Sequence, residues 1–346
     1  MRRERWMALA ALPVLLLAGD IVYWRFAAAR LRAGFDAWTL GAAASGWTVR
    51  YGAIGTGGWP DMAVLRVEDV EIAGGGKAGR PAIVWGAGSV ILRTRLLRPD
   101  VLEITPVAPR DLRLRGGPPI PVAADHARLR LVLRPNAPPS AIDLDIEALQ
   151  AVLPDLGILS IGHLTGHAEI MPAAERNQVG IGFALTAGPV TLPDGVRWGL
   201  GPEVAGLAIE GAVNGPLPDI FATPAVWATA WRDGGGSVDV RRLAVHWGAS
   251  ALSASATLAL DEDLQPMGAG TGKIAGYGAA LDALAANAVI GRSAAKAAKA
   301  VLSLLASPPA DGQPEEVEVP MTLQFRTLSV RQVPLARLPE LNWSER

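Results

Sequence analysis

Alternation of apolar and polar residues with a period of two is the feature of this 346-residue sequence that most limits its fold. Successive side chains of a β-strand point to opposite faces, so a strand with one buried face carries an apolar residue at every second position. At least six separate runs follow this pattern, including 111–115, 128–133, 142–147, 179–186, 252–260 and 317–326. Helices do not produce such runs, and the pattern predicts an elongated, mainly antiparallel β domain over about residues 47–333.

Turn signals rich in Gly and Pro separate these runs and indicate about a dozen strands. One stretch does not alternate: residues 276–306 are rich in Ala and Leu and predict one long helix. The apolar phase changes at Glu68-Asp69, which predicts a β-bulge there. A weak likeness between Ile83–Leu92 and Val245–Leu252 suggests two related β-units, at about 47–195 and 196–333.

An apolar run at residues 6–24 precedes the β domain. As a helix, its nineteen residues measure about 28 Å, close to the thickness of the hydrocarbon core of a bilayer. We therefore expect a basic cytoplasmic tail at 1–5, a transmembrane anchor at 6–26 and an amphipathic helical extension at 27–46. The Arg residues of the tail favour a single-pass protein of the inner membrane with its bulk in the periplasm, ending in a polar tail at 334–346.

A cleaved signal peptide is the alternative to an anchor, because Ala27-Ala28-Ala29 satisfies the small-residue rule for a cleavage site. The bulky residues just before this site favour retention of the helix. Tyr23 and Trp24 suit the membrane interface, where amphipathic rings settle, and they are our candidates for that position.

Composition and motifs exclude several functional classes. A net charge of −1 does not favour nucleic acid, and no cysteine is present for a disulfide or a metal site. The segment Gly268–Ile274 departs from a phosphate loop in glycine spacing and lacks the Ser/Thr that would hold magnesium. His163 and His167 lie on a predicted strand, where residues four apart are about 13 Å distant. We therefore expect no catalytic residues, no cofactor and no metal, and a function other than that of an enzyme.

A series of landmarks along the chain resembles a known family. In order they are Tyr23-Trp24, Ala37-Trp38, residues 46–51 (Gly-Trp-Thr-Val-Arg-Tyr), 57–60 (Gly-Gly-Trp-Pro), 64–72, 235–243, Trp247-Gly248 and 258–268. The chain looks like a member of the bacterial family called domain of unknown function 2125, over nearly its whole length. More distantly, its plan resembles AsmA-like envelope proteins, a group implicated in moving or organising lipids between the two membranes. The resemblance implies a topology and leaves the function open.

The size of the predicted sheet carries the functional hypothesis. About a dozen strands spaced about 4.8 Å apart extend over nearly 58 Å, and one helix about 10 Å wide cannot cover their apolar face. The sheet must therefore curl on itself, pack as a β-sandwich, or hold a ligand. We expect acyl chains of lipid as the ligand, with Leu144 and Ile181 as groove candidates. The alternative is a structural or assembly factor that docks an envelope protein.

Overall fold

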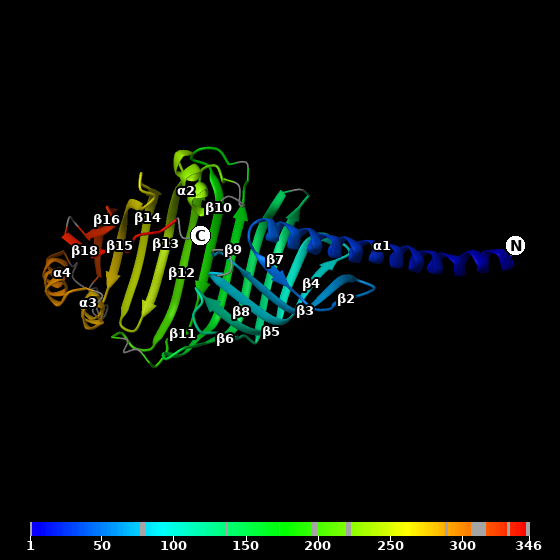
Figure 1. Ribbon diagram of the computed structural model, residues 1–346, viewed down its shortest axis with the longest axis horizontal. Coiled ribbons are helices and arrows are strands. Elements are labelled where there is room, and N and C mark those ends of the chain that lie inside the picture. The colour runs from blue at the N-terminus through cyan, green and yellow to red at the C-terminus, as the bar shows by residue number, and fades with distance from the viewer. Residues whose placement is uncertain are drawn as a thin grey trace. The chain divides into compact units, whose positions relative to one another are not determined.

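The computed structural model describes residues 2–76, 81–135, 137–172, 174–195, 199–218, 223–287, 290–305, 316–330 and 333–343, with side chains from residue 17 onward except at 301, 304, 305 and 333. These residues form eighteen strands and four helices (Figure 1). Every described strand pairing is antiparallel. The predicted mainly β, antiparallel fold is confirmed.

Two compact units make up the chain. The first comprises Met1–Pro119 and Ala127–Pro139, and the second comprises Ile120–His126 and Ser140–Arg346. The chain passes between them three times within residues 119–140, so neither unit is one continuous segment.

The first unit contains one helix and six strands. These are α1 (Arg2–Ala44), β1 (Thr48–Arg50), β2 (Ile54–Gly57), β3 (Met62–Gly74), β4 (Ile83–Arg95), β5 (Arg98–Leu114) and β7 (His126–Arg134). Strand β3 pairs with β1, β2 and β4, while β5 pairs with β4 and β7.

Helix α1 packs on β3 through one side of its C-terminal half. The core there consists of Phe35 from the helix with Leu65, Val67, Val70 and Leu92 from the strands, all nearly inaccessible to water. Burying each of these side chains contributes about 1.5–3 kcal/mol to folding. The apolar residues of β3 and β4 thus position α1 on the sheet.

The apolar phase of β3 changes at Asp69, as expected from the sequence. Asp69 has a φ of 48°, in the left-handed region, and Val67 and Val70 on either side of it are both buried in the same core. The pairing of β3 with β4 nevertheless keeps one register through this point, from Glu68 opposite Ser89 to Val70 opposite Ala87. The prediction of a bulge with an extra residue is therefore wrong, and a left-handed residue turns the side chains instead.

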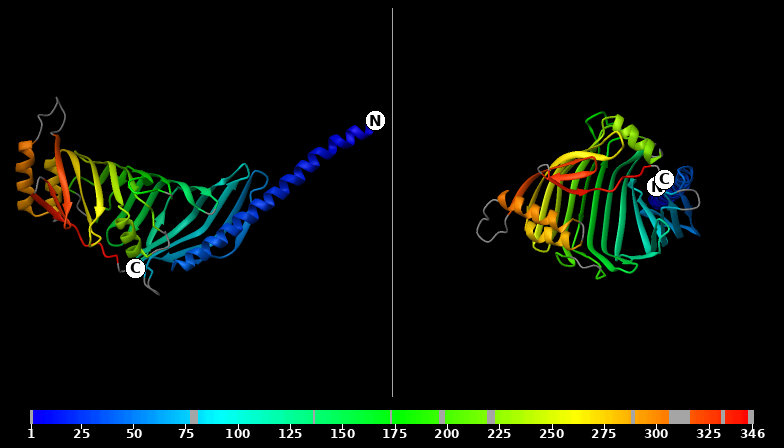
Figure 2. Two further views of the ribbon diagram at one scale, coloured as in Figure 1. Left: turned by 90° about the horizontal axis from the view of Figure 1, so that it is seen from above. Right: turned by 60° about the vertical axis from the view of Figure 1, so that its left-hand side comes forward.

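The second unit is built mainly of strands that pair with their neighbours in the sequence. They are β6 (Ile120–Ala123), β8 (Ala137–Leu153), β9 (Gly157–Ile170), β10 (Val179–Ala187), β11 (Val190–Thr191), β12 (Glu203–Asn214), β13 (Ser237–Trp247), β14 (Ser250–Leu260), β15 (Pro266–Ala275), β16 (Glu316–Gln324), β17 (Thr327–Val330) and β18 (Val333–Arg337). Strands β8, β9, β10 and β12 to β18 pair one after another, with register shifts in the β10–β12, β12–β13, β13–β14 and β17–β18 pairings. Strand β11 continues beside β10 between β9 and β12. Figure 2 shows this succession from green β9 to yellow β15.

The helices of the second unit differ from the prediction. In place of one helix over 276–306, the chain forms α3 (Tyr277–Ala286) and α4 (Arg292–Leu305), and residue 306 lies outside the described part. Asn287 ends α3, and its side-chain amide donates a hydrogen bond of 3.0 Å to the carbonyl oxygen of Ala283. A further helix, α2 (Pro224–Asp233), was not predicted; it begins at a proline, which is favourable at a first helical position.

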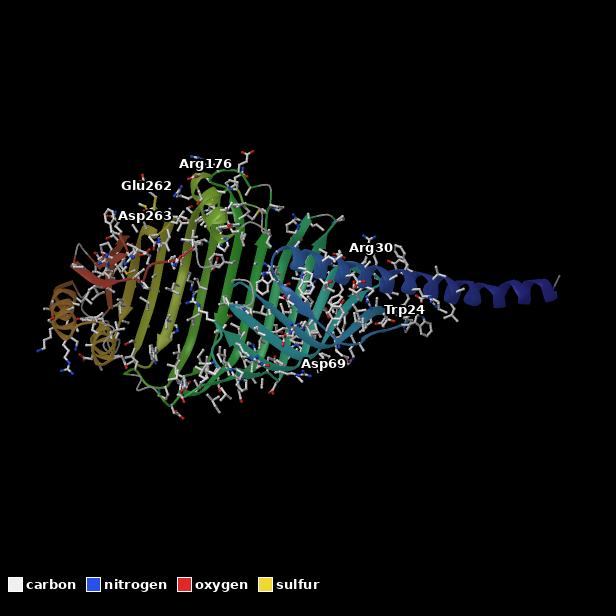
Figure 3. The ribbon with its side chains drawn as sticks, viewed as in Figure 1. Trp24, Arg30, Asp69, Arg176, Glu262 and Asp263 are labelled. Atoms are coloured by element: carbon white, nitrogen blue, oxygen red, sulfur yellow. The ribbon has the colours of Figure 1, made fainter. Side chains whose placement is uncertain are left out.

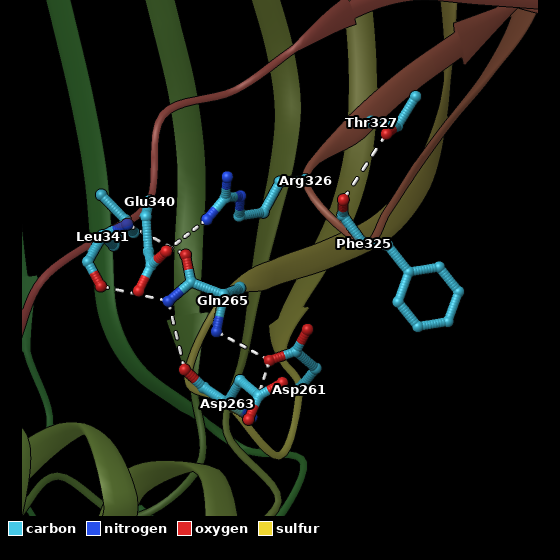
Figure 4. A network of polar contacts seen from close by, with 8 residues as sticks. All are labelled: Asp261, Asp263, Gln265, Phe325, Arg326, Thr327, Glu340 and Leu341. Carbon is cyan, nitrogen blue, oxygen red and sulfur yellow. Dashed lines mark hydrogen bonds and ion pairs between the residues drawn. The ribbon is translucent and has the colours of Figure 1, made fainter.

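The end of the second unit is held by hydrogen bonds to Gln265, whose side chain is buried (Figure 4). Its amide nitrogen donates to the carbonyl oxygens of Asp263 and Leu341, each at 3.1 Å, and its amide oxygen accepts from the backbone N–H of Leu341 at 2.9 Å. Arg326 forms an ion pair with Glu340 in the same network. The segment after β18 is thus fixed to the turn before β15.

The side chains of residues 6–16 of the predicted anchor at 6–26 lie outside the described part. Within the residues that are described, no helix combines the length and the apolar character needed to cross a membrane.

Candidate functional site

One face of the second unit is apolar across many strands, and we call it the apolar face. Paired positions from β8 to β16 form rows that run across the strands. One row consists of Leu144, Gly166, Leu185, Ile209, Leu243, Ala254, Gly272 and Val319. The next row on the same face consists of Ile146, Leu164, Ala187, Leu207, Val245, Leu252, Ile274 and Val317. Neither row contains a charged or hydrogen-bonding side chain.

The row between these two points to the opposite face and is largely polar. It consists of Asp145, Thr165, Thr186, Ala208, Ala244, Ser253, Lys273 and Glu318. The hydroxyl groups of Thr165 and Thr186 lie 2.5 Å apart, and Lys273 forms an ion pair with Glu318 at 3.3 Å. The contrast between adjacent rows shows that the alternation seen in the sequence is the difference between two sheet faces.

Side-chain contacts place Leu144 and Leu185 together over Gly166. A Cβ atom at Gly166 would lie 3.3 Å from Leu185 Cδ1 and 3.4 Å from Leu144 Cβ. Further along the same face the ring of Phe183 covers Gly211, with Cζ 2.8 Å from the position that a Cβ atom would take. These glycines therefore allow large apolar side chains to lie flat across neighbouring strands.

Both groove candidates from the sequence lie on the apolar face. Leu144 is in β8 and Ile181 is in β10, where it pairs with Ile170 and Val213. Both are half-buried. Ile181 is four residues from Leu185, the β10 residue in the row of Leu144, so the two candidates are about 13 Å apart along the strands. They belong to one surface without being in contact.

The described helices of the second unit cover only part of this face. Helices α3 and α4 pack at β14 and β16, and α2 reaches the end of β12, where Trp231 Nε1 donates a hydrogen bond of 3.0 Å to the carbonyl oxygen of Asn214. In Figure 1 none of the second unit's described helices, α2, α3 and α4, lies across the middle of β8 to β13. The apolar rows on those strands are half-buried, in contrast to Val317 and Val319, which are each 1% exposed beneath α3 and α4.

A small apolar cavity lies where the helices cover the face. It has a volume of about 140 Å³ and is lined by ten residues: Ile274, Tyr277, Ala280, Leu281, Leu284, Ala298, Leu302, Val319, Val330 and Leu335. Ile274 and Val319 also belong to the two apolar rows. The sequence predicted one helix in this region but not the cavity, whose lining includes residues of both α3 and α4.

On the polar side, His167 lies beside two carboxylates. Its Nδ1 atom lies 2.7 Å from Asp143 Oδ1, and its Nε2 atom lies 3.6 Å from Glu169. The hydrogen bond with Asp143 raises the pKa of His167 from its ordinary value of 6.5, and the negative charges of Asp143 and Glu169 act in the same direction. His163 lies opposite Glu147 in the same strand pair.

The polar face also has a recess of about 550 Å³ on β10 and β12 to β15. Three of its polar side chains bond to one another: Asp239 accepts hydrogen bonds from Asn214 at 2.6 Å and from Thr257 at 2.8 Å. Among the described residues, no group of three or more His, Cys, Asp or Glu side chains is placed to hold a metal ion.

The two interface candidates, Tyr23 and Trp24, join α1 to the strands of the first unit (Figure 3, Trp24 labelled). The hydroxyl group of Tyr23 donates a hydrogen bond of 3.0 Å to the carbonyl oxygen of Leu96, and Trp24 Nε1 donates one of 3.0 Å to the carbonyl oxygen of Met62. Both partners lie at the ends of β3 and β4. No local pattern in the sequence indicates these two contacts.

The model of a family described as uncharacterized proteins conserved in bacteria, DUF2125, matches residues 24–339. The chain belongs to this family. The match begins at Trp24 and extends over both units of the DUF2125 fold, which confirms the family resemblance drawn from the motifs. No curated protein and no solved structure matches the chain. The wider likeness to AsmA-like proteins has no support from these comparisons.

Proposed function

We propose that this DUF2125 protein is anchored in the inner membrane by residues 6–24, with both units in the periplasm, and that it binds acyl chains of lipid on its apolar face. The observation that carries the binding proposal is the pair of apolar rows from Leu144 and Ile146 in β8 to Leu243 and Val245 in β13, which are half-buried and are not covered by the described helices of their own unit.

An apolar surface of this extent favours a nonpolar occupant. Exposed apolar patches larger than a few hundred Å² are uncommon in soluble domains unless they bind something. The rows offer no hydrogen-bonding side chain to a polar ligand, whereas methylene groups gain about 0.8 kcal/mol each when they leave water. An extended chain of methylene groups matches a surface that is long and uniformly apolar.

Photo-crosslinking of the full chain in bacterial cells tests this proposal. A photo-reactive residue at Leu144 or Ile181 is expected to form adducts with phospholipid, identified by mass spectrometry of the purified protein. Asp145 and Thr186 are matched controls, because they lie on the polar face: Asp145 is in β8 with Leu144, and Thr186 is in β10 with Ile181. Lipid adducts at the two apolar positions and not at the two controls would support binding on the apolar face.

Two outcomes would contradict acyl binding. Adducts to protein alone at Leu144 and Ile181 would favour the alternative, a structural or assembly factor that docks an envelope protein through this face. Equal lipid adducts at all four positions would indicate contact with bulk membrane and not a specific face.

A further inference from the structure

The end of the β3–β4–β5 sheet in the first unit carries an exposed apolar and aromatic surface next to α1. We call it the strand tip and define it by Trp59, Arg95, Leu97 and Arg98. We propose that the strand tip lies against the lipid bilayer, with Leu97 and Trp59 inserted at the interface. This inference rests on the proposed membrane anchor and adds a second, strand-based contact with the same bilayer.

Hydrogen bonds from two consecutive residues of α1 hold the strand tip at one height along the helix. Tyr23 OH bonds to the carbonyl oxygen of Leu96, and Trp24 Nε1 bonds to that of Met62, each at 3.0 Å. The backbone N–H of Leu96 in turn donates to the carbonyl oxygen of Asp61 at 3.1 Å, which joins the β4–β5 turn to the loop before β3. These three bonds hold the loop, the turn and the helix together.

The two leucines of the β4–β5 turn differ in side-chain exposure. Leu96 is 6% exposed and faces the protein, whereas Leu97 is 93% exposed, and Trp59 in the neighbouring loop is 47% exposed. A single exposed leucine is ordinary on a protein surface. Here the bonded helix also carries exposed apolar residues at the same level, including Val22 at 68% and Phe26 at 58%, so helix, turn and loop each present apolar side chains to solvent.

The predicted position of the membrane identifies the partner as lipid. The apolar run at 6–24 ends at Tyr23 and Trp24, so the bilayer interface is expected at their level. Because the hydrogen bonds hold the β4–β5 turn and the start of β3 at that level, Leu97 and Trp59 meet the same interface. Tryptophan is favoured in this region, where its ring is buried while its N–H stays near water.

Two arginines flank Leu97 in the turn, and the side chains of both Arg95 and Arg98 are exposed. Arg98 also forms an ion pair of 3.4 Å with Asp100, and an exposed pair of this kind contributes little in water. Guanidinium groups bind phosphate through paired N–H donors. The two arginines therefore suit the phosphates of lipid headgroups just outside the position proposed for Leu97.

The absence of native cysteine allows a clean test with single labels. Leu97→Cys carries an environment-sensitive fluorophore in the full chain reconstituted in phospholipid nanodiscs, with nitroxide-labelled lipid as the quencher. Val22→Cys on α1 reports membrane insertion of the anchor. Leu114→Cys is the matched control: Leu114 is 46% exposed and pairs with Ile83 at the opposite end of β4 and β5, about 40 Å from the turn.

We expect a blue shift and quenching by nitroxide lipid at positions 97 and 22, and neither at position 114. If position 22 is quenched while position 97 behaves like position 114, the strand tip does not touch the bilayer, although the anchor stands. If position 22 is not quenched, the anchor and the inference both fail. A label at position 97 shielded from lipid quencher and from aqueous iodide alike would indicate a protein contact and would also overturn the inference.

Discussion

Replacing Gly211 with alanine tests the packing of the apolar face at a single atom. A Cβ atom at this position would lie 2.4 Å from the carbonyl oxygen of Asp239 and 2.8 Å from Cζ of Phe183, both far inside normal contact distance. The oxygen belongs to the backbone of β13 and cannot rotate away. Gly182, opposite Ala212 in the same strand pair, has no atom within 4 Å of the place where a Cβ atom would lie and serves as the matched control.

The two substitutions should change the stability of the second unit in opposite directions. At Gly182 an alanine reduces the entropy of the unfolded chain and is expected to stabilise by about 0.4–1 kcal/mol. At Gly211 the same gain is outweighed by overpacking, which typically costs about 1–3 kcal/mol. Because the entropic gain is common to both variants, we expect them to differ by the overpacking cost of about 1–3 kcal/mol, or about 0.5–1.5 M urea for an m-value near 2 kcal/mol/M.

Urea titration of the full chain in one detergent, followed by pulse proteolysis, measures this difference. Gly211→Ala, Gly182→Ala and the parent chain are compared at the same protein and detergent concentrations. Equal midpoints for the two variants would refute the reasoning, because they would mean that Phe183 and the β13 backbone do not lie over Gly211. The placement of Phe183 on the apolar face would then have to be abandoned.

Three further perturbations follow from other contacts. Gln265→Ala removes the hydrogen bonds to Leu341 and Asp263 and should destabilise by about 1–3 kcal/mol, with faster hydrogen exchange at Leu341. Leu302→Ala enlarges the cavity beneath α4, where Leu302 is 6% exposed, and should cost about 3–5 kcal/mol in urea unfolding, whereas Ser303→Ala on the exposed side should change stability by less than about 0.5 kcal/mol. The raised pKa of His167 adds stability that is fully present below pH 6.5 and is lost as the pH rises through the folded-state pKa, so urea midpoints at pH 5.5 and 8.5 should differ more for the parent than for His167→Asn. A pH dependence unchanged in that variant would contradict the role of the bond to Asp143.

The alternation in the sequence predicted the strands because it has a direct physical counterpart in the two faces of a sheet. Residues 142–147 illustrate this: Ile142, Leu144 and Ile146 share one face, and the acidic residues between them share the other. The break between α3 and α4 was missed because Ala-rich sequence continues on both sides of it, although Asn287 and Gly291 mark the ends of the two helices.

Contacts between distant parts of the chain could not be predicted in the same way. Nothing in the local pattern around Tyr23 or Trp24 points to the carbonyl groups of Leu96 and Met62, and nothing near Gln265 points to Leu341. Such bonds depend on how whole elements are placed, whereas alternation depends only on neighbouring residues. The phase change at Asp69 was visible in the sequence, but its cause, a left-handed residue in an unbroken register, required backbone angles.

The strands from β12 to β18 each pair with the next strand in the sequence, which gives this part of the chain a low contact order. Each new strand can add to the growing edge soon after it is synthesised, without waiting for a distant partner. The arrangement is also modular in length: inserting or deleting one hairpin shifts the edge by two strand spacings, about 9.6 Å, and leaves the pairing of the other strands intact. The width of the apolar face is therefore set by the number of hairpins, in discrete steps that duplication of a short segment of the gene can supply.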